Sequence, residues 1–149
     1  MLSSKAKYGL KAMVHLARYG GQGSVLIADI AAKERIPKKF LDAILLEMKN
    51  NGLLSSKKGK GGGYALARPA AQIRVGDLVR VLDGPLAPVP CVSRTAYRRC
   101  TDCDDEGSCA VRAVMQDVRD AIAQILDNTT LADMSERTPR AETLLLYDI

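Results

Sequence analysis

Two short helical patterns, joined by a proline break and followed at once by a glycine-rich hairpin pattern, restrict this chain to few folds. A helix is predicted over 27–35, with apolar positions at Ile27, Ile30 and Ala31. The Ile36-Pro37 pair ends it, and Pro37 suits the first position of the next helix. That helix should end at the sequence NNG over 50–52, and its apolar positions are Phe40, Leu41, Ile44, Leu45 and Met48. This order is that of a helix-turn-helix, although a helix pair that only forms core has the same pattern.

The sequence LLSSKKGKGGGYALARP predicts a β-hairpin directly after these helices. Strands are expected over 53–56 and 64–67, with a turn over 59–63 whose glycines permit positive φ and close approach to a surface. Three lysines near the tip repel one another unless an anion neutralises them: Lys57, Lys58 and Lys60. We therefore favour a wing that contacts DNA phosphates or the minor groove over a flexible surface hairpin.

Composition and the flanking patterns predict a mostly α-helical fold with a small β-hairpin wing. Hydrophobic residues make up 47% of the chain but include only five Tyr, one Phe and no Trp, so the core must be largely aliphatic, which favours helices. A helix is predicted over 5–19, with apolar positions at Tyr8, Met13, Leu16 and Tyr19. The sequence QIRVGDLVRVLDG predicts a short strand and a helix that closes a winged helix-turn-helix domain, 1–83.

The charge is divided unevenly along the chain. Residues 1–83 hold 15 Lys and Arg against 6 Asp and Glu, whereas residues 84–149 hold 7 against 11. The first part is basic enough to bind phosphate, although a solvated basic surface would have the same composition. No apolar run reaches membrane-spanning length and no signal-peptide pattern opens the chain, so we expect a cytoplasmic protein without a membrane partner.

All four cysteines fall in one polar segment, at Cys91, Cys100, Cys103 and Cys109. With the proline-rich linker before them they form a predicted sensor loop, 84–109. In a reducing cytosol, clustered thiols favour metal or redox chemistry over structural disulfides. We favour a labile [2Fe–2S] or [4Fe–4S] cluster; structural zinc and a metal-free thiol/disulfide switch remain alternatives. A thiol oxidoreductase enzyme is disfavoured, because no thioredoxin-like βαβ pattern surrounds the CxxC pair.

The strongest helical pattern follows the cysteines. Its apolar positions repeat at three and four, and are Val111, Val114, Met115, Val118, Ile122, Ile125 and Leu126. We favour packing against the same helix of a second subunit, as two-fold operator binding requires, over packing on its own domain. This assigns 110–133 as a homodimerisation helix. It leaves 134–149 as a tail with a polar, disordered start and an LLLY segment as a docking candidate.

The order of these motifs closely resembles that of the IscR/NsrR/CymR family of winged-helix transcriptional regulators. The resemblance covers about residues 1–133, and its most specific motif is the glycine-rich wing with Tyr-x-Leu-Ala. It implies a dimeric repressor of double-stranded DNA whose long helices cross. It also implies an iron–sulfur cluster that controls DNA binding in response to iron, redox state or nitric oxide.

The resemblance implies DNA contacts from three elements. Lys58 matches a basic residue that enters the minor groove, whereas Lys60 stands where some members have Pro. Lys38, Lys39 and Asp42 match the first turns of the recognition helix; Asp42 suits a cytosine N4 contact, with an exposed structural charge as the alternative. The first helix supplies backbone contacts. The whole predicted set is Lys5, Lys7, Tyr8, Lys38, Lys39, Asp42, Lys57, Lys58, Lys60, Gly61, Gly62, Gly63 and Tyr64.

The cysteine pattern departs from that family. Its cluster binders usually have three cysteines and a fourth ligand from elsewhere, whereas this segment has four cysteines and no His. We predict all four as metal ligands, and expect the sole histidine, His15, to be packed or DNA-facing. Ligand binding in the loop should order the start of the dimer helix and so set the spacing of the two recognition helices.

Overall fold

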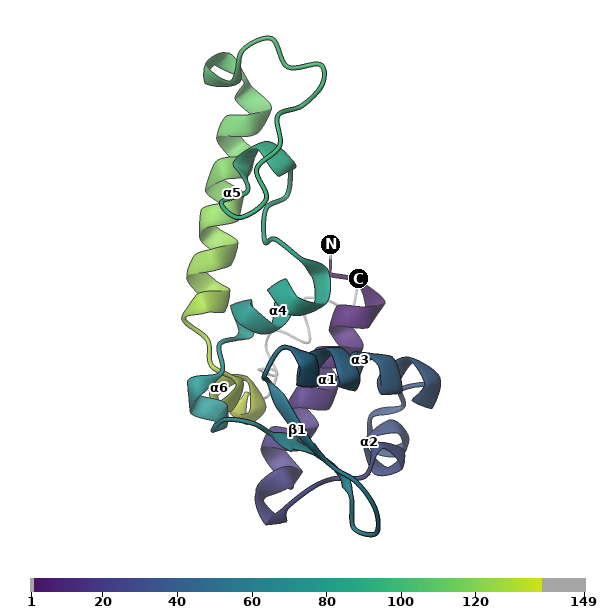
Figure 1. Ribbon diagram of the computed structural model, residues 1–149. Coiled ribbons are helices and arrows are strands. Elements are labelled where there is room, and N and C mark those ends of the chain that lie inside the picture. Colours follow the sequence, from purple (N-terminus) through teal and green to yellow (C-terminus); the bar gives the residue numbers. More distant parts are fainter. Residues whose placement is uncertain (1, 138–149) are drawn as a thin grey trace, which may run out of the picture.

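A computed structural model describes residues 2–137 of the 149-residue chain and confirms the predicted fold class: helices with a single two-stranded antiparallel hairpin among the described residues (Figure 1). The helices are α1 (Ser4–Tyr19), α2 (Ile27–Glu34), α3 (Lys38–Asn50), α4 (Val75–Asp83), α5 (Ala110–Asp127) and α6 (Leu131–Glu136). The strands are β1 (Leu54–Lys57) and β2 (Gly63–Leu66). Short 3₁₀ segments lie at η1 (Gly20–Gln22), η2 (Ala70–Gln72), η3 (Pro90–Val92) and η4 (Glu106–Ser108).

The helix-turn-helix forms where the sequence predicts it. Arg35 ends α2 in the left-handed conformation, with φ of 54°, and Ile36 turns into the core with 3% of its surface exposed. Pro37 is at the N-cap position, immediately before α3, and not at the first position of the helix as predicted. The core beneath is aliphatic, as expected, and is built from Ala6, Ala12, Met13, Leu16, Ile30, Ile36, Leu41, Ile44, Leu45, Met48, Leu53, Leu54, Ile73, Leu78, Leu82 and Leu131.

Two aromatic residues at predicted apolar positions are exposed to solvent. Phe40 is 61% exposed, because the buried stripe of α3 runs through Leu41 and Leu45 and places Phe40 at its edge. Tyr19 is 55% exposed at the end of α1, where its ring lies 4.8 Å from that of His15. Both belong to the predicted apolar positions, but a three-or-four spacing also admits positions that flank the buried stripe.

The hairpin is shifted by one residue in each strand from the prediction. Leu54 pairs with Leu66 and Lys57 with Gly63. Backbone hydrogen bonds of 2.8 and 2.9 Å between Val25 and Tyr64 hold β2 to the start of the helix-turn-helix. The strand predicted before α4 is reduced to one isolated bridge, between Arg74 and Thr130.

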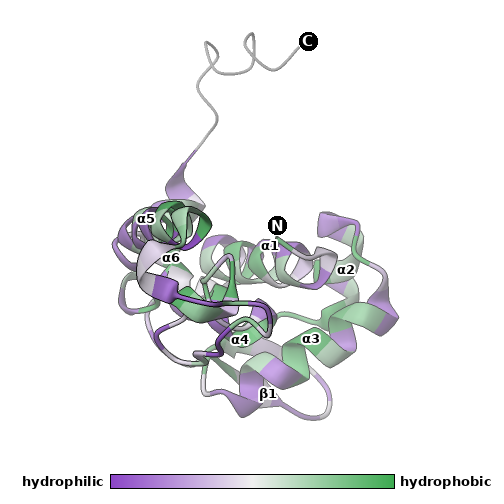
Figure 2. Ribbon diagram, turned by 90° about the horizontal axis from the view of Figure 1, so that it is seen from above, coloured by the Kyte–Doolittle hydropathy of each residue, from purple (hydrophilic) through white to green (hydrophobic). Residues whose placement is uncertain are grey.

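Helix α5 projects from the helical domain, and the cysteine segment runs up beside it to its tip (Figure 1). Seen along its axis, its hydrophobic residues gather on one side (Figure 2). It ends at Asp127, short of the predicted 133, and the chain then turns back into the domain as α6. Thr130 and Asp133 form a capping box there, and Leu131 is fully buried. The predicted LLLY segment and most of the predicted tail lie outside the described residues.

Candidate nucleic-acid interface and cysteine loop

The start of α3 presents an exposed group of charged side chains. Lys38 and Asp42, one turn apart, form an ion pair with a 3.8 Å separation, and their side chains are 62% and 48% exposed. Lys39 beside them is also exposed. The ammonium of Lys38 offsets the repulsion between the Asp42 carboxylate and a DNA phosphate, while leaving that carboxylate free to accept another hydrogen bond.

The hairpin tip is shaped by glycines that adopt positive φ. Gly59 and Gly61 have φ of 88° and 77°, and the three tip lysines are all exposed. Gly63 has φ of 143°, and a Cβ there would lie 2.1 Å from the carbonyl oxygen of Val25. Glycine at this position therefore allows the wing to lie directly against the chain before α2.

A groove of about 640 Å³ lies between α3 and the hairpin. It brings together six predicted DNA-facing residues: Lys38, Lys57, Lys58, Gly62, Gly63 and Tyr64. Lys49, Leu26 and Leu46 also line it and were not predicted. Lys49 could have been found by following the exposed face of α3 one turn at a time from Lys38.

The predicted residues of α1 lie beside this surface. Lys5 forms an ion pair of 2.6 Å with Glu47 of α3, and Lys7 is exposed. Tyr8 is half-buried against the core and shares a separate apolar cavity of about 460 Å³ with Phe40. The predicted wing residue Tyr64 is also half-buried, and its backbone bonds to Val25 give it a structural role.

The four cysteines differ in their surroundings. Cys91 is 7% exposed, Cys100 is exposed, and Cys103 and Cys109 are half-buried. The pKa of the Cys100 thiol is raised by desolvation, then by the neighbouring Cys91 thiol and Asp102, with a smaller contribution from Cys103. Cys109 instead caps α5, where its Sγ accepts a hydrogen bond of 3.4 Å from the backbone N–H of Arg112. Cys91 is thus the thiol that acts most strongly on Cys100, whereas Cys109 is used to cap α5.

Hydrogen bonds fold the loop back on itself and onto α5. The backbone N–H of Arg98 donates to the carbonyl of Pro90 over 3.2 Å, which returns the chain to the turn that holds Cys91. The hydroxyl of Tyr97 donates to the carboxylate of Glu106, which raises the pKa of that phenol. Arg119 of α5 donates to the carbonyl of Val92 over 2.7 Å. A change in the loop would therefore act directly on α5.

The predicted four-cysteine metal site is not assembled in this arrangement. The part of the chain that the structure describes contains no group of three or more His, Cys, Asp or Glu side chains placed to hold a metal ion. The donor set suits a cluster in number and type, but the positions of the thiols do not. His15, predicted to be packed or DNA-facing, is packed: it is 5% exposed and its Nδ1 lies 2.9 Å from Oε1 of Glu34.

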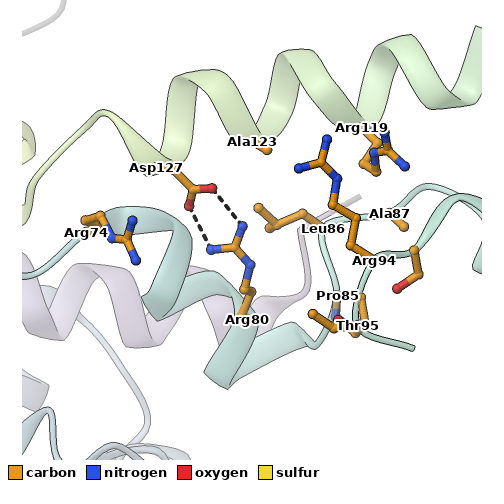
Figure 3. A pocket seen from close by; sticks show the side chains of 11 residues that line it. Arg74, Arg80, Pro85, Leu86, Ala87, Arg94, Thr95, Arg119, Ala123 and Asp127 are labelled. Atoms are coloured by element: carbon orange, nitrogen blue, oxygen red, sulfur yellow. Dashed lines mark hydrogen bonds and ion pairs between the residues drawn. The ribbon is translucent and has the colours of Figure 1, made fainter. Parts of the chain in front are cut away.

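Sequence patterns missed an ion pair between α4 and α5. The guanidinium of Arg80 donates to both carboxylate oxygens of Asp127, over 2.7 and 2.8 Å (Figure 3). Gly76 makes room for it, since a Cβ there would lie 2.0 Å from Oδ1 of Asp127. No local motif marks this pair, because the two residues are 47 positions apart.

Comparison with known proteins identifies the family. The Rrf2 family model, described as an iron-dependent transcriptional regulator, matches residues 2–137. The chain belongs to the Rrf2 family of transcriptional regulators. The predicted family is thus confirmed, and with it a DNA-binding winged-helix regulator.

Regulators named CymR and regulators named IscR both resemble this Rrf2-family protein. A Rhodobacter capsulatus protein, named as an rrf2-like HTH-type transcriptional regulator, is 40% identical over 137 residues, 90% of this chain and 91% of that protein. CymR of Bacillus subtilis is 32% identical over 148 residues, 99% of each chain. Its solved structure, described as the global cysteine regulator, has a TM-score of 0.77 and covers 93% of this chain and 98% of that one. IscR of T. potens, at 28% identity, has a TM-score of 0.71 and covers 95% of each chain. Within residues 2–137 of this Rrf2-family chain, every helix is too short or too polar to cross a bilayer.

Proposed function

We propose that this regulator binds a two-fold operator as a homodimer and that the chemical state of the cysteine loop sets its affinity for DNA. The observation that carries this proposal is the packing of the loop: Cys91, beside Cys100, lies in the turn that Arg119 of α5 holds. Helix α5 is in turn joined to α4 of the DNA-binding domain by Arg80 and Asp127. The loop is therefore connected through named contacts to the element that would space the two DNA-binding domains.

The homodimer is supported by the uncovered apolar face of α5. None of its residues is buried, and Val111, Val114 and Ile125 are 63%, 57% and 62% exposed. An exposed apolar stripe along a projecting helix is typical of a subunit interface. Of the other predicted interface residues on this helix, Val118 is 37% exposed, and the remaining three are half-buried: Met115, Ile122 and Leu126.

The dimer is tested by placing charge on that stripe. The double variant Val114→Asp, Ile125→Asp should sediment as a monomer at concentrations where the wild type is a dimer, because paired carboxylates in an apolar interface are costly to bury. Gln124→Asp, on the opposite face of α5, is the control and should remain dimeric. A double variant with unchanged mass in solution would place the dimer contact elsewhere.

Two chemistries are proposed for the loop. The first is the iron–sulfur cluster, supported by four thiols in one segment and by the iron-dependent description of the family. Since the thiols as placed do not converge, it requires a different loop arrangement. The second is a disulfide between Cys91 and Cys100, supported by the effect of the Cys91 thiol on the pKa of Cys100 and by the hydrogen bond that brings Arg98 back to Pro90. Hydrogen peroxide as oxidant would take two electrons and two protons from the thiols and become two waters. Structural zinc is the alternative to the cluster as an occupant of the same thiols.

One set of measurements distinguishes these chemistries. The protein would be purified without oxygen and analysed for iron, acid-labile sulfide, zinc and free thiols. Promoter duplex would then be titrated with and without peroxide, for wild type and for Cys91→Ser, Cys100→Ser and Cys109→Ser. A disulfide switch predicts that the first two variants lose a response of about tenfold or more in Kd, while Cys109→Ser keeps it. A cluster predicts iron matched by sulfide and loss of iron in all three variants.

One result would contradict the proposed sensor function. If every cysteine variant bound the duplex as the wild type does, with and without iron and peroxide, the loop would not set affinity. The protein would still be a DNA-binding regulator, but its signal would enter elsewhere.

A further inference from the structure

An arginine-lined cavity of about 290 Å³ lies where α4, the linker and α5 meet (Figure 3). Four guanidinium groups line it, from Arg74, Arg80, Arg94 and Arg119, against one carboxylate, that of Asp127. The carboxylates of Asp77 and Asp120 pair with these arginines from just outside the lining, so four positive charges stand against three negative ones. Such an excess in a concave site attracts anions.

Two of these arginines keep terminal nitrogens that donate to no protein acceptor among the described residues. Arg80 uses both terminal nitrogens on Asp127, and Arg119 donates to Asp120 and to the carbonyl of Val92. Arg74, by contrast, donates only through Nε, to Asp77, and Arg94 only through one terminal nitrogen, to Asp120. Among residues 2–137, the remaining N–H groups of Arg74 and Arg94 have no protein acceptor, so each can take an oxyanion.

We propose that this cavity binds a small organic dianion with two carboxylate groups on a short carbon chain. Arg74 and Arg94 would each bind one carboxylate, since they stand toward opposite ends of the cavity (Figure 3). Pro85, Leu86 and Ala123 form an apolar wall between them that suits a short aliphatic body better than a fully polar phosphate.

The cavity lies on a different side of α5 from the proposed dimer interface. Arg119, Ala123 and Asp127 follow one another at four-residue steps along α5 and face the chain's own linker and α4. The exposed apolar stripe, with Val114 and Ile125, lies on another side of the helix. The site contains no cysteine, but Arg94 belongs to the same loop as the cysteines, so binding is titrated with the four thiols reduced and without added metal.

The test uses succinate as the probe, with inorganic phosphate and chloride at matched ionic strength. Isothermal titration of the full chain should give a Kd of about 1 mM or tighter for succinate, and binding at least about tenfold weaker for phosphate. Arg74→Gln and Arg94→Gln should each weaken succinate binding at least about tenfold. These side chains are 57% and 74% exposed, so both variants should fold, and unfolding curves would verify it.

The matched control is Arg137→Gln, which removes the same charge from an exposed site outside the cavity. It should leave succinate binding unchanged. Absence of succinate binding would overturn the proposal. So would equal binding of succinate and phosphate, or equal binding by wild type and both cavity variants, since these mark a diffuse attraction of ions.

Discussion

Among single side chains, Arg80 and Asp127 make the contact that ties the projecting helix to the DNA-binding domain. Hydrogen bonds from Arg80 hold the pKa of the Asp127 carboxyl below its usual range, against desolvation that acts in the opposite direction. The same pairing raises the pKa of Arg80. Both residues are charged at neutral pH, and the pair is part-buried.

Replacing Asp127 with Asn should lower the free energy of unfolding by about 1 kcal/mol at neutral pH, a modest value because solvent screens a pair that is about a third exposed. A carboxyl with a lowered folded-state pKa contributes stability that is fully present above its unfolded-state pKa of about 3.9 and is lost as pH falls through the folded-state value. The difference between wild type and variant should thus be constant above about pH 5 and vanish in stronger acid. Urea unfolding across this range measures it.

Asp117→Asn, on the exposed side of α5, is the control and should change stability by less than about 0.5 kcal/mol at any pH. A wild-type advantage over Asp127→Asn that persists unchanged in strong acid would show that the ion pair is not its source.

At the level of elements, α3 and the hairpin form the basic surface that should bind DNA. Changing Lys57, Lys58 or Lys60 to Gln should weaken binding to every duplex alike and reduce the slope of log K against log salt by about 0.9 for each phosphate that is no longer neutralised. Binding to promoter and to unrelated duplex, measured by anisotropy at several salt concentrations, tests this. Lys33→Gln, whose side chain lies over the Tyr19 ring, is a charge-matched control. If its salt slope fell as much as those of the wing variants, net charge rather than the wing would explain the effect.

The elements themselves were predictable because local rules specify them. Pro37 and the glycines of the wing predict where this chain turns. The spacing of apolar residues predicts α1, α3, α4 and α5. The small errors, such as the one-residue shift of the strands, arise where competing pairings differ little locally. The orientation of Phe40 depends on packing that the spacing within one segment does not reveal. Helix α6 has a local signal, the Thr130–Asp133 capping box, which apolar spacing alone passes over.

The candidate site was predictable in its parts more than in its assembly. The lysines and glycines of the wing were identified by composition, and the structure brings several of them to one groove with Lys38. The cysteines were identified as a set, but their different surroundings were not. Cys109 caps a helix through a local contact with Arg112, whereas the burial of Cys91 follows from tertiary contacts that the sequence does not display.

For the whole molecule, the core is closed from both ends of the described chain. Leu131 of α6 is fully buried beside Ile73, whose carbonyl accepts its backbone N–H over 2.8 Å. Leu131→Ala should therefore lower the free energy of unfolding by about 3 kcal/mol, because burial is reduced and a cavity is left behind. Met134→Ala, at a half-buried position of the same helix, should cost about 1 kcal/mol. Chemical unfolding of both variants would measure this, and similar destabilisation by the two would mean that α6 is peripheral to the core.

Because the chain returns to the core after α5, residues 84–128 form an arm, the cysteine arm, whose two ends both lie in the core. It leaves the core after Asp83 and rejoins it at Thr129, whose carbonyl accepts a hydrogen bond of 2.9 Å from Val75. The arm is thus an insertion within the DNA-binding domain, and a peptide bond cut inside it would leave two fragments still joined through one core. Its length can change while both attachment points stay fixed, because a surface segment between two anchored ends tolerates insertions better than the core does.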